Sequence, residues 1–447
     1  MTTARLRQLW ADLLASFWVR PVVMTVAAAC LAEGLVRIEG AVSLPSWIEA
    51  WVYAGGGAGA RDVLGAIASA TIGVAGTTFS ITVAALSLAS NQMGPRLLRN
   101  FTRDPGNQYS LGALLATFAY SLVALRSVYE TDQHTFVPQI AVSVALLLAF
   151  VCVGVLIWFL HHVALSINVD RVVALVHGDL AEALRRLPDV TEEPETEDAE
   201  PMPDGPRASL FAPEGGYLRV LDDAALADWA EEHDAWVELR TRPGNFVFPG
   251  SVIGEVAPAS LRADAQKAVA RTLALGDSRS VEQDLEYAVR QLVEMGLRAL
   301  SPGINDPMTA IAVLDRLGAA LCELASRQLP SGVTVRDGKQ RLARGATDYP
   351  GLVDAMFHML RQAGTNVPAV MIRLLEVLAE AGAVERDRAR IEWLRVHVDL
   401  TRDAALRGTQ DAAALDAVHE RYRTALAAMQ PPDAADRRAA AAHQASG

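Results

Sequence analysis

A stripe of small and hydroxyl-bearing residues is the first feature of the sequence that could support chemistry. Its members recur every three, four or seven positions along one uncharged stretch, at Ser69, Gly73, Gly76, Ser80, Ser87 and Asn91. In an α-helix this spacing places them on one face. Small residues allow two helices in a membrane to pack closely. A hydroxyl-lined helix could instead face a pore, where weak and exchangeable contacts permit conduction. The residues alone leave both uses open.

Three arginines follow this stripe, at Arg96, Arg99 and Arg103. A ring of arginines at the cytoplasmic mouth of a pore would attract anions. Alternatively, the arginines only set the orientation of the chain, because cytoplasmic loops of membrane proteins are enriched in arginine and lysine.

A second feature is the break "RALSPGINDPMTA", residues 298–310, between two amphipathic helix patterns. Its residue types predict a tight corner, with Gly303 as the flexible turn position, Asp306 as N-cap and Pro307 as the first helical residue. A binding site is the alternative. The oxygens of Asn305 and Asp306 could ligate a hard cation or a small ligand. Free N–H groups of the next helix could instead hold an anion. The residues that would fold back to complete the oxygen site are Glu282 or Asp284.

Other polar residues give weaker indications. Glu33 could be a proton or cation site inside a membrane span, or could lie exposed at the outer boundary. His161 and His162 are adjacent, so their side chains point about 100° apart on a helix and favour an interfacial role over a shared metal. Phosphate-loop, nucleophile-elbow and His-Glu-x-x-His motifs are absent from the sequence. We therefore expect a protein that is not an enzyme and that uses no cofactor.

These residues must be positioned by a membrane-embedded chain. Of the 447 residues, 51% are hydrophobic and only 21% are charged, which is unusual for a soluble protein. Hydrophobicity is concentrated in the first 165 residues, which we interpret as a transmembrane domain. Stretches of adequate length predict four spans, at about 16–36, 63–90, 106–125 and 136–162.

The rest of the chain is predicted to be cytoplasmic. Arginines precede span one and lie between spans two and three, which places both termini in the cytoplasm. Residues 166–187 are expected to continue span four as a helix, and 188–209 read as an acidic disordered linker. A small α+β module at 210–258 and a helical domain at 259–429 follow, then a disordered tail at 430–447. In the helical domain we expect a capping box at Ser280 and Gln283 and a short hairpin turning at Asp337-Gly338.

Two long stretches carry a resemblance to a known family. They are "GTTFSITVAALSLASNQMGPRLLRNFTRD" and "QLVEMGLRALSPGINDPMTAIAVLD". Together with "SFWVRP" and "WFLHHVALSI", they resemble the bacterial membrane-protein family known as domain of unknown function 2254. The resemblance covers nearly the whole chain. It implies a bacterial inner-membrane protein with a cytoplasmic C-terminal region, and it brings no activity and no catalytic residues.

The sequence thus predicts an α-helical membrane protein with four transmembrane helices and a cytoplasmic α+β, mainly helical domain. The expected function is a homo-oligomeric ion channel or small-solute transport protein of the bacterial inner membrane, with the cytoplasmic domain serving assembly and regulation. The alternative is a membrane-anchored sensor or scaffold without conduction. The expected partners are the lipid bilayer and further copies of the chain. A net charge of −12 argues against nucleic acid as a partner.

Overall fold

The computed structural model describes residues 17–41, 52–93, 104–131, 134–166, 169–190, 199–280 and 283–430. The chain divides into two compact units, Met1–Arg171 and Val172–Gly447. Each unit is described by itself.

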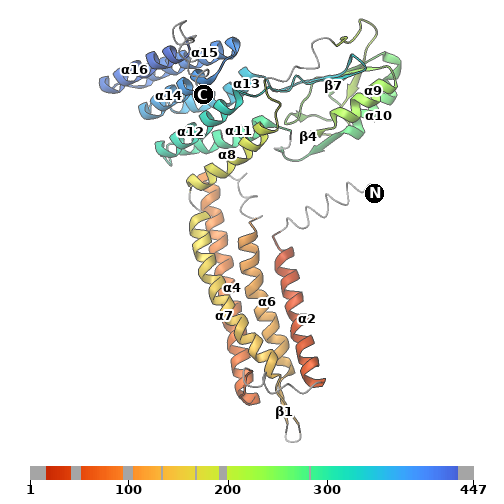
Figure 1. Cartoon of the computed structure of the whole chain (residues 1–447), viewed down its shortest axis with the longest axis vertical. Helices are drawn as coiled ribbons and strands as arrows, with labels where there is room; N and C mark the ends of the chain where they lie inside the picture. The colour runs from red at the N-terminus through yellow and green to blue at the C-terminus, as the bar shows by residue number, and fades with distance from the viewer. Residues whose placement is uncertain are drawn as a thin grey trace, which may run out of the picture. The chain divides into compact units, whose positions relative to one another are not determined.

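The first unit is a bundle of long helices (Figure 1). They are α2 (Val19–Ala41), α4 (Gly57–Met93), α6 (Pro105–Ser127) and α7 (Gln139–Ser166). A short antiparallel hairpin of β1 (Tyr129–Thr131) and β2 (His134–Phe136) follows α6. Among the described residues, four segments are long and apolar enough to cross a membrane, namely Val19–Glu39, Gly57–Ser87, Pro105–Ser127 and Gln139–Leu165. The prediction of a four-span helical membrane protein is confirmed.

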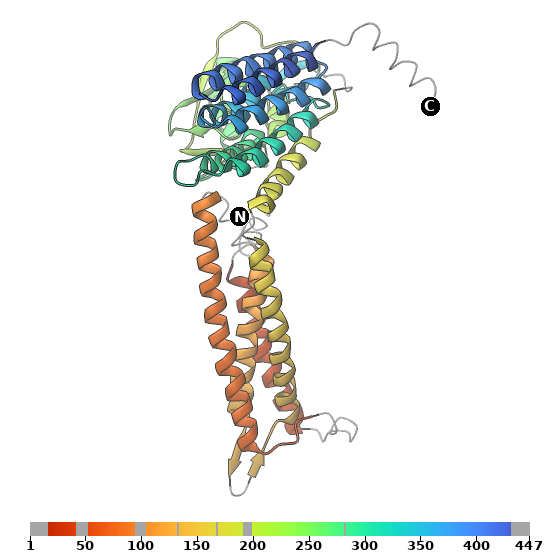
Figure 2. The ribbon, with the colours of Figure 1, turned by 90° about the vertical axis from the view of Figure 1, so that its left-hand side faces the viewer.

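Helix α6 lies at the centre of the bundle, because it packs against α2, α4 and α7 (Figure 2). Small residues make this possible. A Cβ at Gly112 would lie 2.6 Å from Sδ of Met24 on α2, so any larger residue at that crossing would have to displace the Met24 side chain. Towards α7, the buried Tyr120 hydroxyl donates to the carbonyl of Ala141 at 3.1 Å. These contacts order three helices around α6, and among the described residues no other helix covers the far face of α4.

Carboxylates cap the helices of the bundle. Asp104 is the N-cap of α6, and its side chain accepts a hydrogen bond from Gly106 N at 2.9 Å. Glu39, near the end of α2, accepts from Ile140 N at 3.0 Å in the first turn of α7. A carboxylate at a helix N-terminus satisfies free N–H groups and complements the helix dipole. Glu39 therefore links the end of span one to the start of span four.

Helix α8 (Val169–Arg185) contains the division between the units, and from Val172 onward it belongs to the second. Its buried residues, Val173, Val176, Leu180 and Leu184, recur at helical spacing. Helix α7 ends at Ser166 and α8 begins at Val169, and the predicted continuation of span four into α8 stays a prediction. Residues 167 and 168 lie outside the described part of the chain.

Two sheets form the α+β part of this unit. The five-stranded sheet has the order β3-β7-β5-β10-β9, with β10 parallel to β5 and the other pairs antiparallel. Its strands are β3 (Ala208–Phe211), β5 (Trp236–Leu239), β7 (Val252–Ala257), β9 (Val333–Arg336) and β10 (Lys339–Arg344). The antiparallel three-stranded sheet contains β4 (Gly216–Leu221), β6 (Phe246–Val247) and β8 (Leu273–Gly276).

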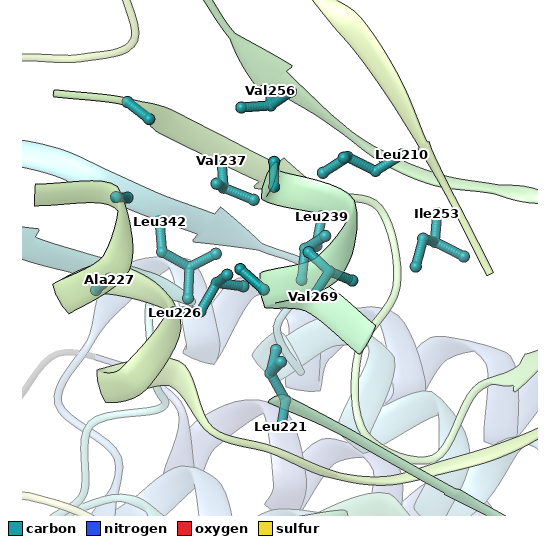
Figure 3. Close-up of a cluster of buried hydrophobic side chains, with 14 of the residues drawn as sticks. Leu210, Leu221, Leu226, Ala227, Val237, Leu239, Ile253, Val256, Val269 and Leu342 are labelled. Atoms are coloured by element: carbon teal, nitrogen blue, oxygen red, sulfur yellow. The ribbon is translucent and has the colours of Figure 1, made fainter. Parts of the chain in front are cut away.

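Helices α9 (Asp223–Glu232) and α10 (Arg262–Thr272) pack on these sheets, with a short 3-10 turn, η2 (Ala259–Leu261), before α10. Figure 3 shows their shared core, in which Leu226 and Val269 from the helices face Val237, Leu239 and Leu342 from the strands. Burying large aliphatic side chains in this way is the main favourable term in folding.

The strands of the five-stranded sheet do not follow the predicted domain boundaries. Its hairpin β9–β10 comes from residues 333–344, within the range predicted as a helical domain, and turns at Asp337-Gly338 as expected. Part of the predicted linker 188–209 is also ordered, because Glu200 N donates to the carbonyl of Gly338 at 2.8 Å. The predicted linker and the predicted helical domain therefore both contribute backbone to the α+β part.

Helices make up the remainder of the unit. They are α11 (Leu285–Ala299), α12 (Pro307–Leu324), α13 (Tyr349–Ala363), α14 (Pro368–Val384), α15 (Arg388–Gly408) and α16 (Ala412–Ala428). The predicted capping box is wrong. Asp284 is the N-cap of α11 and accepts from Tyr287 N at 3.1 Å. Gln283 instead bonds both backbone groups of Leu221 on β4, at 2.9 and 3.0 Å, so its side chain extends the ladder of a strand.

Candidate functional site

Five members of the predicted stripe lie on the open face of α4. These residues, called the α4 stripe below, are exposed in the bundle: Ser69, Gly73, Gly76, Ser80 and Ser87. A Cβ added at Gly73 or Gly76 would meet no atom within 4 Å. The opposite face of α4 is buried and carries Leu64, Ala68, Thr71, Ala75 and Thr78. Within the described bundle, the α4 stripe therefore packs against no other helix of its chain.

Two hydroxyl groups on this face of α4 donate hydrogen bonds to the backbone of their own helix. Ser80 Oγ donates to the carbonyl of Gly76 at 2.9 Å, and the neighbouring Thr77 Oγ1 donates to that of Gly73 at 3.1 Å. A hydroxyl whose hydrogen is used in this way presents only oxygen lone pairs outward. Both groups therefore offer acceptors to whatever covers the face.

The remaining members of this candidate site lie beyond what the structure describes. Asn91 belongs to α4, but its side chain is outside the described part of the chain. Arg96, Arg99 and Arg103 also fall outside the described residues. Their proposed place at a pore mouth stays a prediction.

The corner between α11 and α12 is capped as predicted. Asp306 Oδ1 accepts from Met308 N and Thr309 N, each at 3.1 Å, and Oδ2 accepts from the Thr309 hydroxyl at 2.6 Å. These bonds, that of the hydroxyl first, hold the pKa of the Asp306 carboxyl below its ordinary value. The turn position differs from the prediction, because Asn305, with φ of 49°, adopts the left-handed conformation and Gly303 does not. Asparagine tolerates that conformation better than most residues.

The predicted oxygen site is not assembled from its described members. Asp284 is at the opposite end of α11, a helix of 15 residues and therefore about 22 Å long. There it pairs with Arg279 at 2.6 Å, and burial raises the pKa of its carboxyl. Glu282 lies outside the described residues. The N–H groups of Met308 and Thr309 are bonded to Asp306, so they are not free for an anion. Searched across the described ranges, His, Cys, Asp and Glu form no group of three that could hold a metal.

The two weaker candidates in the spans have identified partners. Glu33 pairs with Arg37 at 2.9 Å and with Arg126 of α6 at 3.0 Å, so it is not a lone carboxylate. His162 Nε2 contacts Asp104 Oδ2, and its ring stacks on Trp158 at a centroid distance of 4.8 Å. His161, by contrast, is exposed.

Sequence reasoning missed the pair of Asp104 and His162. The two residues are 58 positions apart and come from different helices, so no local spacing could indicate the contact. Only the N-cap role of Asp104, readable from Asp104-Pro105, has a sequence signal. The contact of Arg126 with Glu33 is missed for the same reason, since the two are 93 positions apart.

Comparison with known proteins places this arrangement in a family. Residues 15–380 match the profile of a family described as a predicted membrane protein, domain of unknown function 2254. Two proteins named as uncharacterized, from Mycobacterium tuberculosis (strain CDC 1551 / Oshkosh) and Mycobacterium bovis, are each 33% identical over 407 residues, covering 88% of this chain and 77% of theirs. No solved structure matches. The chain belongs to the family of predicted membrane proteins known as domain of unknown function 2254.

Proposed function

We propose that this protein is a homo-oligomeric channel or small-solute transport protein, without enzymatic activity, in which α4 of each copy faces a shared axis. The observation that carries the proposal is the open face of α4, where the α4 stripe is exposed and a Cβ added at Gly73 or Gly76 would meet no described atom within 4 Å. A face of glycine and serine gains little from contact with lipid tails. Further copies of the chain would cover it and enclose water or solute.

The open face of α7 supports this argument by contrast. Its exposed residues are large and apolar, and include Leu147, Phe150, Val153 and Ile157. That composition suits direct contact with lipid tails. The α4 stripe is flanked by exposed Ile72, Phe79 and Val83. We propose that these flanking residues face lipid or a neighbouring copy, while the α4 stripe faces the axis.

The proposed location is the bacterial inner membrane, with both termini and the second unit in the cytoplasm. The positions of the arginines in the sequence support this orientation. Single cysteines at Ser43 and Gln430, in a chain whose own cysteines are replaced, test it in intact cells. An impermeant reagent is expected to label Ser43 and to leave Gln430 unlabelled. The reverse pattern would overturn the orientation.

Flux measurements on liposomes containing the purified full-length protein test conduction. Ser80→Leu is expected to lower flux at least tenfold while the oligomer persists, because a side chain facing a water-filled axis tolerates bulk. Gly154→Leu on α7 is the matched control, since a Cβ there also meets nothing within 4 Å and should leave flux unchanged. Absence of flux from an assembled wild-type protein, under any membrane potential or osmotic load, would sink the proposal.

The same recordings address ion preference. The outward oxygen lone pairs of Thr77 and Ser80 favour cations and water, whereas Arg96, Arg99 and Arg103 would favour anions. Replacing these three arginines by glutamate is expected to move the preference towards cations, because the local potential changes sign.

A sensor or scaffold without conduction is the second candidate. One observation favours it: the bonded hydroxyls of Thr77 and Ser80 need no water, so the face can also pack dry against another copy. In that case Gly73→Leu and Gly76→Leu should abolish assembly, because close backbone approach would become impossible. Cross-linking and flux, measured on the same variants, separate the two candidates.

A further inference from the structure

A cleft of about 660 Å³ runs between α2 and α6. It is lined by Ala29, Cys30, Glu33, Gly34 and Arg37 of α2, and by Leu122, Val123 and Arg126 of α6. Both helices lie among the segments that are apolar and long enough to cross a membrane. The cleft therefore opens where lipid, not water, is the main solvent.

The two ends of this cleft differ in chemistry. Ala29, Cys30, Leu122 and Val123 form an apolar end towards the middle of the spans. The charged residues, Glu33, Arg37 and Arg126, lie near the ends of both helices. Residues 29 to 37 extend about 12 Å along α2, which is enough for a headgroup and the first part of an acyl chain.

The charged end of the cleft carries more positive than negative groups. One carboxylate, Glu33, faces two guanidinium groups, giving a net charge of +1. Arg37 uses Nε and Arg126 uses one terminal nitrogen to reach Glu33. Each arginine has five N–H donors, and these side chains are 78% and 75% exposed. Glu33 thus holds two arginines side by side with most of their donors directed elsewhere.

We propose that this cleft binds an anionic phospholipid, with its phosphate on Arg37 and Arg126 and an acyl chain along the apolar end. Arginine binds phosphate oxygens through two parallel hydrogen bonds, which are stronger than neutral ones. Basic pockets between transmembrane helices bind anionic headgroups in other membrane proteins. The apolar end selects a lipid over a soluble phosphate, because only a lipid fills both parts. This inference does not rest on conduction.

The structure offers a variant that fills the cleft directly. Gly34 lines the cleft, and a Cβ added there would meet no atom within 4 Å. Gly34→Leu should therefore enter the space of the acyl chain without displacing protein atoms. Gly154 on α7 has the same open surroundings and does not line the cleft, so Gly154→Leu is its matched control.

Native mass spectrometry of the full-length protein in detergent, with dioleoyl phosphatidylglycerol or dioleoyl phosphatidylcholine added, measures the binding. The anionic lipid is expected to be retained at least tenfold more strongly than the zwitterionic one. Arg37→Gln combined with Arg126→Gln should reduce retention of the anionic lipid by about tenfold, since both charge-assisted contacts are lost. Gly34→Leu should reduce it similarly. Gly154→Leu should have no effect, and neither should Arg61→Gln, which removes another exposed arginine.

Three outcomes would overturn the proposal. Equal retention of the two lipids would show that the charged end does not select. Unchanged retention in both the arginine double variant and Gly34→Leu would place the lipid elsewhere. Displacement of the lipid by equimolar glycerol 3-phosphate would show that the apolar end contributes nothing. If the double variant fails to fold, Gly34→Leu against Gly154→Leu carries the test alone.

Discussion

Helical glycines on α4 of the first unit and on α11 and α12 of the second have opposite surroundings. On α4, a Cβ at Gly73 or Gly76 would meet no atom within 4 Å. In the second unit, a Cβ at Gly296 would lie 2.7 Å from Leu360 Cδ2, and one at Gly318 would lie 2.6 Å from Val377 Cγ1. The same residue type thus permits close packing within the chain on α11 and α12 and leaves an open face on α4.

This difference teaches what a stripe of small residues can indicate. In the second unit, Gly318 lets α12 approach α14, so a contact within the same chain explains the glycine. On α4, glycine lowers helix propensity by about 1 kcal/mol relative to alanine, without a contact in the described bundle to offset that cost. We therefore look for the compensating contact outside the single chain, which is the basis of the proposed oligomer.

The largest effect is expected from a substitution at a closely packed glycine of the second unit. Gly318→Leu should lower the free energy of unfolding of the second unit by about 3 kcal/mol, because a side chain there must displace Val377 in a well-packed interior. Thermal unfolding of the full-length protein in detergent measures it. Gly178→Leu on α8 is the control, since a Cβ there meets nothing within 4 Å and leucine favours the helix. Equal melting of both variants would contradict the packing account.

Helical periodicity and polar breaks were sufficient to predict the four spans, the mainly helical character of the C-terminal part and the capped corner. These features depend on local spacing, which a single sequence contains. Pairings between distant segments could not be predicted. The strand β10 joins β5 across about a hundred residues, and Arg126 reaches Glu33 across 93. The predicted position of Asp284 beside Asn305 and Asp306 was wrong for a different reason. Asp284 is the N-cap of α11 through its hydrogen bond with Tyr287 N and pairs with the nearby Arg279, so it stays at the far end of that helix.

A smaller effect is expected at the starts of α6 and α12, one helix from each unit. Each has an aspartate as N-cap and a proline as its first residue. Asp306→Ala should cost about 1 kcal/mol of stability, whereas Asp306→Asn should be nearly neutral because its amide oxygen can still accept from Met308 N and Thr309 N. Asp104→Ala should cost more than Asp306→Ala, since Asp104 also contacts His162. Thermal unfolding of the variants provides the measurement. A loss of function in Asp306→Asn without a change in stability would instead point to a charge-dependent site.

The smallest expected effect is on the pH dependence of stability. The two units differ here because they bury different kinds of polar group. Those described in the bundle are uncharged, such as Asn107, Thr117 and Ser121, whereas the second unit buries ionisable groups, including Asp284 and His397. Burial lowers the pKa of His397 below its ordinary value of 6.5, although Asp354, at 3.0 Å, opposes that effect. Arg361 and His358 also disfavour its charge.

A lowered histidine pKa means that the unfolded chain binds the proton more readily than the folded one. Stability should therefore be unaffected by His397 well above pH 6.5 and should fall as the pH drops through 6.5 towards the lower folded value. His397→Gln removes this contribution to the pH dependence of stability, because glutamine does not titrate. Melting temperatures at pH 7.5 and 5.5 should thus differ less in His397→Gln than in the wild type, with the bundle contributing little to either difference. An identical acid-induced drop in the two proteins would show that His397 is not its source, since the raised pKa of the Asp284 carboxyl favours the folded state as the pH falls.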